Sequence, residues 1–197
     1  MGETRRGPRE RMVSSAAQLI RRDGVAATGM REVAAHAAAP RGSLQHYFPG
    51  GKQQLVNEAV GFAGRYAGQR IGRLLEGLAE PTPSALFAAM ADQWTDEYTA
   101  DGFVACCPLA AAVVECAASD GSAREAVAAA FAAWRTPLAE ALTGMGVPAG
   151  RADALAALMI STLEGALLLA RAEADVRPLT TAARELGPLL DAAATGG

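Results

Sequence analysis

Polar side chains that can contact nucleic acid are concentrated in the stretch RGSLQHYFPGGKQQL, residues 41–55. Ser43, Gln45 and His46 carry hydroxyl, amide and imidazole groups, which can donate hydrogen bonds to bases and phosphates or accept them from bases. Gly42 has no side chain to hold a phosphate backbone away. The pattern favours a short segment that reads base edges at close range.

Groups suited to binding phosphate flank this segment. Lys52, the one lysine of the chain, begins a new helical pattern, where its ammonium and the N–H groups of the first turn can share a phosphate. We predict Thr28, Tyr47 and Lys52 as phosphate anchors, and the polar residues of 41–46 as base readers. The candidate DNA-binding residues are Thr28, Arg31, Arg41, Gly42, Ser43, Gln45, His46, Tyr47 and Lys52.

Charge is divided unevenly along the chain. Residues 1–52 hold nine basic and four acidic groups, a formal charge of +5, which leaves −8 for residues 53–197 in a chain of formal net charge −3. A basic head on an acidic body indicates a module that binds a polyanion. Arg5, Arg6 and Arg9 are predicted to form an arm that follows the phosphate backbone or enters the adjacent minor groove.

The sequence of the basic head predicts three helices. Pro8 can open a helix that the Asp-Gly pair at 23–24 ends. Thr28 is a suitable N-cap for a second helix. The residue before Pro40 should be extended or turned, and a third helix is expected over 41–47. Two short helices joined by a tight break predict a helix-turn-helix, with the second helix free to enter a major groove.

The remainder of the chain also predicts helices. Its composition is half apolar, rich in Ala and Leu and poor in aromatic residues, which argues against strands. The expected helices span 53–78, 84–98, 104–118, 122–142, 148–175 and 178–193. We therefore expect an all-α chain, with a helix-turn-helix DNA-binding domain over 1–52 and a helical effector-binding and dimerisation domain over 53–197.

The stretch REVAAHAAAPRGSLQHYFPGGKQQL, residues 31–55, resembles the helix-turn-helix of the TetR family of bacterial transcriptional repressors. The residues that carry the resemblance are Gly42, Leu44, Tyr47, Phe48, Lys52 and Leu55. The string APRGSLQHYFPGGK, and later CCPLAAAVVE at 106–115, resemble the LmrA/YxaF-like branch, which regulates multidrug-efflux genes. Two positions depart from the family. Ala38 stands where a turn glycine is usual, and Gln45 stands where an aromatic residue is frequent.

The resemblance implies that the helix after Lys52 links the DNA-reading head to a ligand-binding body. This helix contains four glycines, which could form a hinge or allow close helix packing. They are Gly61, Gly64, Gly68 and Gly72. The last two helices are apolar on more than one side, so one face should pack inward and the other, including Leu186 and Leu190, should meet a second subunit.

The large residues of the body are candidates for binding an apolar, aromatic or amphipathic effector. The alternative is that they only fill the core. The candidate effector-binding residues are Met90, Trp94, Tyr98, Phe103, Cys107, Phe131, Trp134, Met159 and Leu163.

Three cysteines, Cys106, Cys107 and Cys116, lie close together in the sequence. No signal peptide precedes them, so we expect a cytoplasmic protein with reduced, mostly buried thiols. The absence of a CxxC pair and of nearby histidines argues against zinc. A thiol-based, redox-responsive regulator remains the alternative hypothesis.

The apolar stretch at 152–174 could be mistaken for a membrane span. Glu164 and Gly165 inside it fit a helix buried between protein partners better than a helix in lipid. The sequence also lacks a nucleophile–base–acid set, a metal-ligand cluster and a phosphate-binding glycine loop, so we expect neither an enzyme nor a cofactor. It predicts a repressor that binds a palindromic operator as a homodimer. A small hydrophobic or aromatic effector would release it, and it would control an efflux or detoxification gene.

Overall fold

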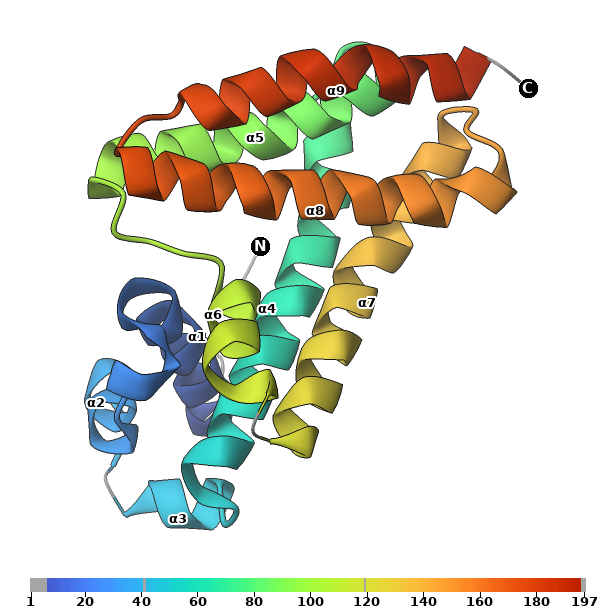
Figure 1. The fold of residues 1–197 in the computed structure, drawn as a ribbon. Helices are drawn as coiled ribbons and strands as arrows, with labels where there is room; N and C mark the ends of the chain where they lie inside the picture. The colour runs from blue at the N-terminus through green and yellow to red at the C-terminus, as the bar shows by residue number, and fades with distance from the viewer. Residues whose placement is uncertain (1–6, 41, 119, 196–197) are drawn as a thin grey trace. The chain divides into compact units, whose positions relative to one another are not determined.

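The computed structural model describes residues 7–40, 42–118 and 120–195. Secondary structure over these residues is helical throughout (Figure 1), which confirms the all-α prediction. The elements in chain order are α1 (Pro8–Ala27), α2 (Met30–His36), α3 (Ser43–Tyr47), α4 (Gly51–Glu76), α5 (Pro83–Asp101), α6 (Pro108–Ala112), the π-helical turn η1 (Val113–Ala117), α7 (Gly121–Gly144), α8 (Ala149–Glu173) and α9 (Arg177–Thr195).

The chain forms two compact units. The first contains residues 1–64 and 106–131, and the second contains residues 65–105 and 132–197. Helices α4 and α7 each contribute to both units. These units do not coincide with the division at residue 52, which was predicted between a DNA-binding part and an effector-binding part. That functional division stays a prediction.

Helix α1 is broken near its end by Gly24. Pro8 occupies its first turn as predicted, and Met12, Leu19 and Ile20 are fully buried. The predicted stop at 23–24 is a kink instead of an end, because Gly24 adopts φ 84° and ψ 173° and the chain then makes one more helical turn to Ala27. Glycine tolerates this backbone conformation, which side chains with a Cβ rarely adopt.

The turn between α2 and α3 closes with an alanine in the left-handed region. Gly29, and not Thr28, is the N-cap of α2. At the other end of α2, Ala38 has φ 48°. Its N–H donates to the Ala35 carbonyl at 3.1 Å, and the Ala39 N–H donates to the Ala34 carbonyl at 2.9 Å. This bonding is the Schellman pattern, which usually has glycine at the left-handed position.

Helix α3 is shorter than predicted but packs as expected. It begins at Ser43, and Gly42 is its N-cap. Leu44 and the following Phe48 are buried, at 8% and 1% exposure. Their burial fixes which face of α3 points outward.

The segment at 104–118 is not the single helix that was expected. Pro108 starts α6 at its first turn and restricts the residue before it, so the chain is non-helical up to Cys107. After one α-helical turn the chain widens into η1. The Cys106 N–H donates to the Arg21 carbonyl of α1 at 2.8 Å, which ties this segment to α1 within the first unit.

Glycines of α4 allow close contact with α7. A Cβ on Gly64 would overlap the backbone of Ala130, and a Cβ on Gly68 would lie 2.4 Å from the Ala133 carbonyl oxygen. At these two positions the structure supports close packing, which was one of the two interpretations of the glycine pattern.

The second unit contains three long helices, α5, α8 and α9, that run side by side (Figure 1). The Asp191 carboxylate of α9 accepts hydrogen bonds from the N–H of Ser84 at 2.9 Å and from its hydroxyl at 2.6 Å, at the start of α5. The Tyr98 hydroxyl of α5 donates to the Leu167 carbonyl of α8 at 3.2 Å. Leu190 is fully buried among these helices, so the prediction that it lies on an intersubunit surface is wrong.

Helix α8 is long and apolar enough to cross a bilayer by length and composition, the one such helix among the described residues. Its side chains at Leu155, Met159 and Leu163 are nevertheless buried within the second unit. A core helix of a globular domain meets the same criterion, so length and composition alone do not assign α8 to a membrane.

The left-handed conformation of Ala38 should make the protein less stable than it would be with glycine at this position. The conformation costs a residue with a Cβ roughly 1–2 kcal/mol, which glycine would avoid. The greater conformational entropy of glycine in the unfolded chain would offset about 0.5–1 kcal/mol of that stabilisation. Ala38 is exposed, so replacing it removes no packing. We expect Ala38→Gly to raise the free energy of unfolding by about 0.5–1 kcal/mol, measured by urea denaturation.

The matched control is Ala35→Gly. Ala35 is also exposed, but it lies inside α2, so this change should lower stability by about 0.5–1 kcal/mol. Loss of stability in both variants would contradict the left-handed assignment of Ala38.

Candidate DNA-binding interface

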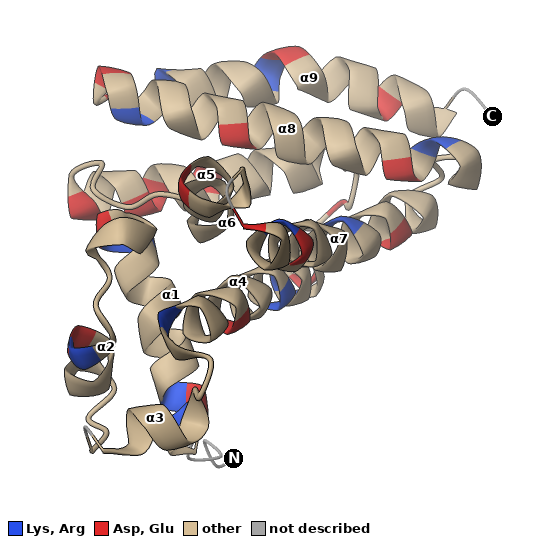
Figure 2. Cartoon of the chain, turned by 60° about the horizontal axis from the view of Figure 1, so that its bottom comes forward, with Lys and Arg blue, Asp and Glu red and all other residues tan. Residues whose placement is uncertain are grey.

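Helix α3 presents polar side chains on its outer face. Gln45 and His46 are exposed, and Ser43 and Tyr47 are half-buried. The helix contains no Lys, Arg, Asp or Glu, and its ribbon is uniformly tan in Figure 2. Base contacts from α3 would therefore come from a hydroxyl, an amide and an imidazole, as the sequence predicted.

Local contacts already constrain some of these side chains. The Ser43 hydroxyl donates to the Pro40 carbonyl at 2.5 Å, which leaves its oxygen able to accept. The rings of His46 and Tyr47 meet edge to face, with centroids 5.0 Å apart. A Cβ on Gly42 would meet no atom within 4 Å, so the glycine is not required by packing inside the protein. The predicted close approach of a DNA backbone would use the space that the missing side chain leaves.

The predicted cationic residues differ in what they contact. Arg31 is exposed near the start of α2. Arg5, Arg6 and Arg41 lie outside the described residues. Arg9 does not belong to an N-terminal arm, because it is part of α1. Its guanidinium pairs with Glu58 of α4 at 2.7 Å and lies 5.5 Å from the Phe48 ring centroid.

Lys52 lies in the first turn of α4, as predicted, and it has a partner inside the head. Its ammonium donates to the Ala26 carbonyl at 3.0 Å. An ammonium has three donors, so two remain for a phosphate. The contact places Lys52 against the short turn that follows Gly24.

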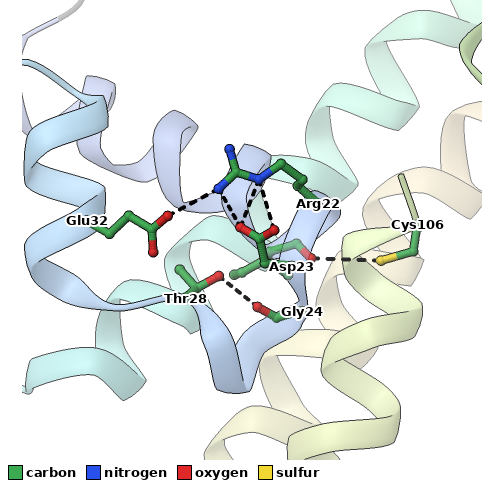
Figure 3. Close-up of polar contacts among 7 residues, drawn as sticks. Arg22, Asp23, Gly24, Thr28, Glu32 and Cys106 are labelled. Carbon is green, nitrogen blue, oxygen red and sulfur yellow. Dashed lines mark hydrogen bonds and ion pairs between the residues drawn. The ribbon is translucent and has the colours of Figure 1, made fainter. Parts of the chain in front are cut away.

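Thr28 has a different local role from the one expected. It is the C-cap of α1, it is 3% exposed, and its hydroxyl donates to the Gly24 carbonyl at 2.7 Å (Figure 3). A hydroxyl has a single proton, so this bond leaves none for a phosphate oxygen. The predicted phosphate contact of Thr28 would require that bond to open.

Glu115 is a residue of the site that sequence reasoning missed. Its carboxylate, carried by η1, accepts from the N–H of Val25 at 2.9 Å and from the N–H of Ala26 at 2.6 Å. A Cβ on Gly24 would lie 2.7 Å from the same carboxylate. Nothing in the sequence pattern pairs Glu115 with residues about 90 positions earlier in the chain.

An ion-pair cluster lies beside this junction. The Arg22 guanidinium bonds Asp23 at 2.6 Å and Glu32 of α2 at 3.2 Å (Figure 3). The hydrogen bonds from Arg22 lower the pKa of the Asp23 carboxyl below its ordinary value. Arg22 thus joins α1 to α2, and its charge is neutralised within the head.

The surroundings of the cysteines disfavour thiolate formation. The Cys106 thiol, labelled in Figure 3, donates to the Arg21 carbonyl at 3.1 Å. Cys107 is buried. Burial raises the pKa of the Cys116 thiol, and the charges of Glu115 and Asp120 raise it further. A raised pKa lowers the thiolate fraction and hence the reactivity.

The predicted effector residues are divided between the two units. Cys107 and Phe131 belong to the first unit, and the others belong to the second. In the second unit the structure brings together three aromatic rings of α5 and the residues after it. Tyr98 lies 5.9 Å from Trp94 and 5.2 Å from Phe103, between ring centroids. The buried residues of the predicted set are Met90, Tyr98, Cys107, Trp134, Met159 and Leu163.

The sequence of this chain matches two families of bacterial transcriptional regulators. Residues 13–59 match the family "Bacterial regulatory proteins, tetR family", and residues 83–185 match the family "Transcriptional regulator LmrA/YxaF-like, C-terminal domain". The uncharacterized HTH-type transcriptional regulator Rv0196 of Mycobacterium tuberculosis is 44% identical over 191 residues, covering 93% of this chain and 94% of that protein.

A lower-identity sequence relative and a solved structure also match this chain. The HTH-type transcriptional regulator LmrA of Bacillus subtilis is 28% identical over 173 residues, covering 87% of this chain and 90% of its own. The crystal structure of a TetR transcriptional regulator from Legionella pneumophila superposes with a TM-score of 0.77 at 18% identity, covering 95% of this chain and all of that one. The chain therefore belongs to the TetR family of helix-turn-helix, DNA-binding transcriptional regulators, and its C-terminal domain is of the LmrA/YxaF-like type.

Proposed function

We propose that this regulator is a repressor that binds a palindromic operator as a homodimer and leaves it when a small hydrophobic or aromatic molecule binds the body. The observation that carries the proposal is the outward face of α3, with exposed Gln45 and His46 beside an uncrowded Gly42. The gene it represses would encode an efflux or detoxification protein, by analogy with the LmrA/YxaF-like branch.

DNA contact divides into reading and anchoring in this proposal. Ser43, Gln45 and His46 read base edges, and Arg41 keeps the base-reading role that the sequence predicts for it. Arg31, Tyr47 and Lys52 bind phosphates, and Gly42 lets the backbones approach. Because α3 carries no fixed charge, most of the electrostatic affinity must come from cations outside it.

Two alanine variants separate the two roles. Lys52→Ala should weaken binding to every sequence, and the slope of log K against log salt should fall by about one for each phosphate that the ammonium neutralises in the wild type. Gln45→Ala should keep that slope but lose about 1–3 kcal/mol of discrimination at one operator position, because the amide can pair with adenine. Selection of binding sites from random DNA and salt titrations measure both.

The contrary results are distinct. Identical preferred sequences for wild type and Gln45→Ala would remove Gln45 from the base readers. If the salt slope of Lys52→Ala equals that of the wild type, the wild-type ammonium of Lys52 binds the Ala26 carbonyl and does not neutralise a phosphate.

The dimer is assigned to α8 and α9. An exposed stripe along α8 contains Leu158, Ser161, Gly165 and Leu168, spaced three and four residues apart, and it carries no charge. Leu168 is 63% exposed and Leu189 of α9 is 50% exposed in the single chain. An uncharged stripe of apolar and small residues is what an isologous helix interface needs.

Leu168→Glu should therefore dissociate the dimer. An unpaired charge placed in a dry interface costs about 3 kcal/mol or more, which weakens association at least about a hundredfold. Light scattering after size exclusion measures the mass. Val114→Glu adds the same charge at a valine of η1 that is 81% exposed, and it should stay dimeric. A dimeric Leu168→Glu protein would place the subunit contact elsewhere.

The effector is assigned to the aromatic residues of the body. Trp94, Tyr98 and Phe103 form a row of rings, and Met159 and Trp134 are buried in the same unit. An effector that lowers operator affinity about a hundredfold needs about 2.7 kcal/mol of coupling. Burial of about 100 Å² of apolar surface is worth about 2.5 kcal/mol, so a small aromatic molecule is large enough.

Tryptophan fluorescence tests this assignment. Planar aromatic and cationic compounds should quench Trp94 and Trp134 and release operator DNA over the same concentration range. The variants Trp94→Phe and Trp134→Phe assign the quenching to one ring. Quenching without loss of operator affinity would contradict the coupling, because a ligand shifts only an equilibrium whose two states it binds unequally.

The thiol-based alternative has weaker support. The raised pKa of Cys116 and the bond from the Cys106 thiol to Arg21 both disfavour thiolate formation. Peroxide titration of operator binding decides between the hypotheses. Release by peroxide that Cys106→Ser or Cys116→Ser abolishes would favour the redox regulator.

A further inference from the structure

The turn that follows Gly24 is held in place by a carboxylate from a distant part of the chain. Gly24 interrupts α1, so the amides just after it begin a new turn and lack carbonyl partners four residues earlier. Val25 is 5% exposed, and a buried N–H without a partner is costly. Glu115 supplies both acceptors, one oxygen to Val25 and the other to Ala26.

We propose that Glu115 is a positioning residue for operator binding, because its carboxylate holds the junction of α1 and α2 in the conformation that presents the helix-turn-helix to DNA. The proposal rests on DNA binding by the helix-turn-helix and is independent of the proposed effector. It concerns contacts within the first unit alone.

The two hydrogen bonds from Val25 and Ala26 to Glu115 are called the clamp below. The Ala26 peptide connects this clamp to Lys52, the predicted phosphate anchor. Its N–H donates to Glu115 at 2.6 Å, and its carbonyl accepts from Lys52 at 3.0 Å. The two charged side chains thus bind the N–H and the carbonyl of one residue. Hydrogen bonds to ionised groups are about twice as strong as neutral ones, so loss of the carboxylate frees a turn that Lys52 also contacts.

Two further contacts set the register of the clamp. The Cys106 N–H bonds the Arg21 carbonyl at 2.8 Å, so the segment of chain leading into α6 is fixed to α1 just before the kink. The Thr28 hydroxyl bonds the Gly24 carbonyl at 2.7 Å, which closes the turn from its other side. Glycine at position 24 suits the φ of 84°, and a Cβ there would lie 2.7 Å from a Glu115 carboxylate oxygen, so a larger residue would displace the carboxylate.

The π-helical form of η1 offers a way to withdraw the carboxylate. A π turn holds an extra residue relative to an α-helix. Resolving η1 into α-helix would shift its register by one residue and turn Glu115 by about 100° around the axis, since an α-helix has 3.6 residues per turn. That rotation would take the carboxylate off both amides, so the geometry of residues 113–117 would govern the DNA-reading head.

Glu115→Gln tests the clamp with almost no change in shape. A glutamine keeps one acceptor oxygen but has an NH₂ group in place of the other, and this donor group would face one of the two amide protons. We expect the amide protons of Val25 and Ala26 to move upfield in the NMR spectrum and to exchange faster with solvent. If the competent conformation falls to about a tenth of the population, operator affinity falls about tenfold.

Glu125→Gln is the matched control, because Glu125 is exposed on α7 and the change removes the same charge. It should leave both amides and operator affinity as in the wild type. Operator binding is measured at a temperature at which the amide spectrum shows each variant folded. The wild type, measured in parallel, reports on operator binding itself, so failure of the clamp is distinguishable from failure of DNA binding.

Two results would overturn the proposal. Unchanged Val25 and Ala26 amides in Glu115→Gln would mean that the carboxylate does not hold them in solution. Altered amides with wild-type operator affinity would mean that the clamp is a local structural contact without influence on DNA binding.

Discussion

The backbone conformation of Gly24 is the constraint on which the DNA-reading head depends. A φ of 84° breaks the hydrogen-bond ladder of α1 and leaves amides and carbonyls that other groups must satisfy. Glu115, Lys52 and Thr28 satisfy them from three different parts of the chain. A single turn therefore joins α1, η1 and the start of α4, and α2 begins only a few residues later.

In the DNA-reading head, the side chains proposed to read bases and those that carry positive charge lie on different elements. Helix α3 carries polar side chains but no Lys or Arg, and the Lys and Arg side chains of the described residues lie on other elements. Several of those cations are used internally, since Arg9 pairs with Glu58 and Arg22 pairs with Asp23 and Glu32. The positive charge of residues 1–52 thus overstates what is available to phosphate. The remaining cations, among them Arg31 and two donors of Lys52, gain importance accordingly.

Local rules explain most of the helices and fail where the chain carries an unusual backbone. Proline and glycine signals indicated the start of α1 and the breaks before α4 and α5. They did not predict the π-helical turn, because it differs from an α-helical turn by one extra residue, which the residue types of so short a segment do not indicate. Leu190 illustrates the same limit. Its spacing indicates an apolar face, but spacing cannot tell an inner face from an intersubunit one.

The sequence by itself determined the family, the all-helical class and the outward polar face of α3, because these depend on residue type and short-range period. Even the odd Ala38 was visible as a departure from the usual turn glycine, and its φ of 48° agrees with that interpretation. Tertiary structure alone decided that Thr28 faces inward, that Arg9 binds α4 and that Glu115 holds the turn after Gly24. These contacts join residues whose side chains meet only after distant helices have packed, and no local period encodes such a meeting.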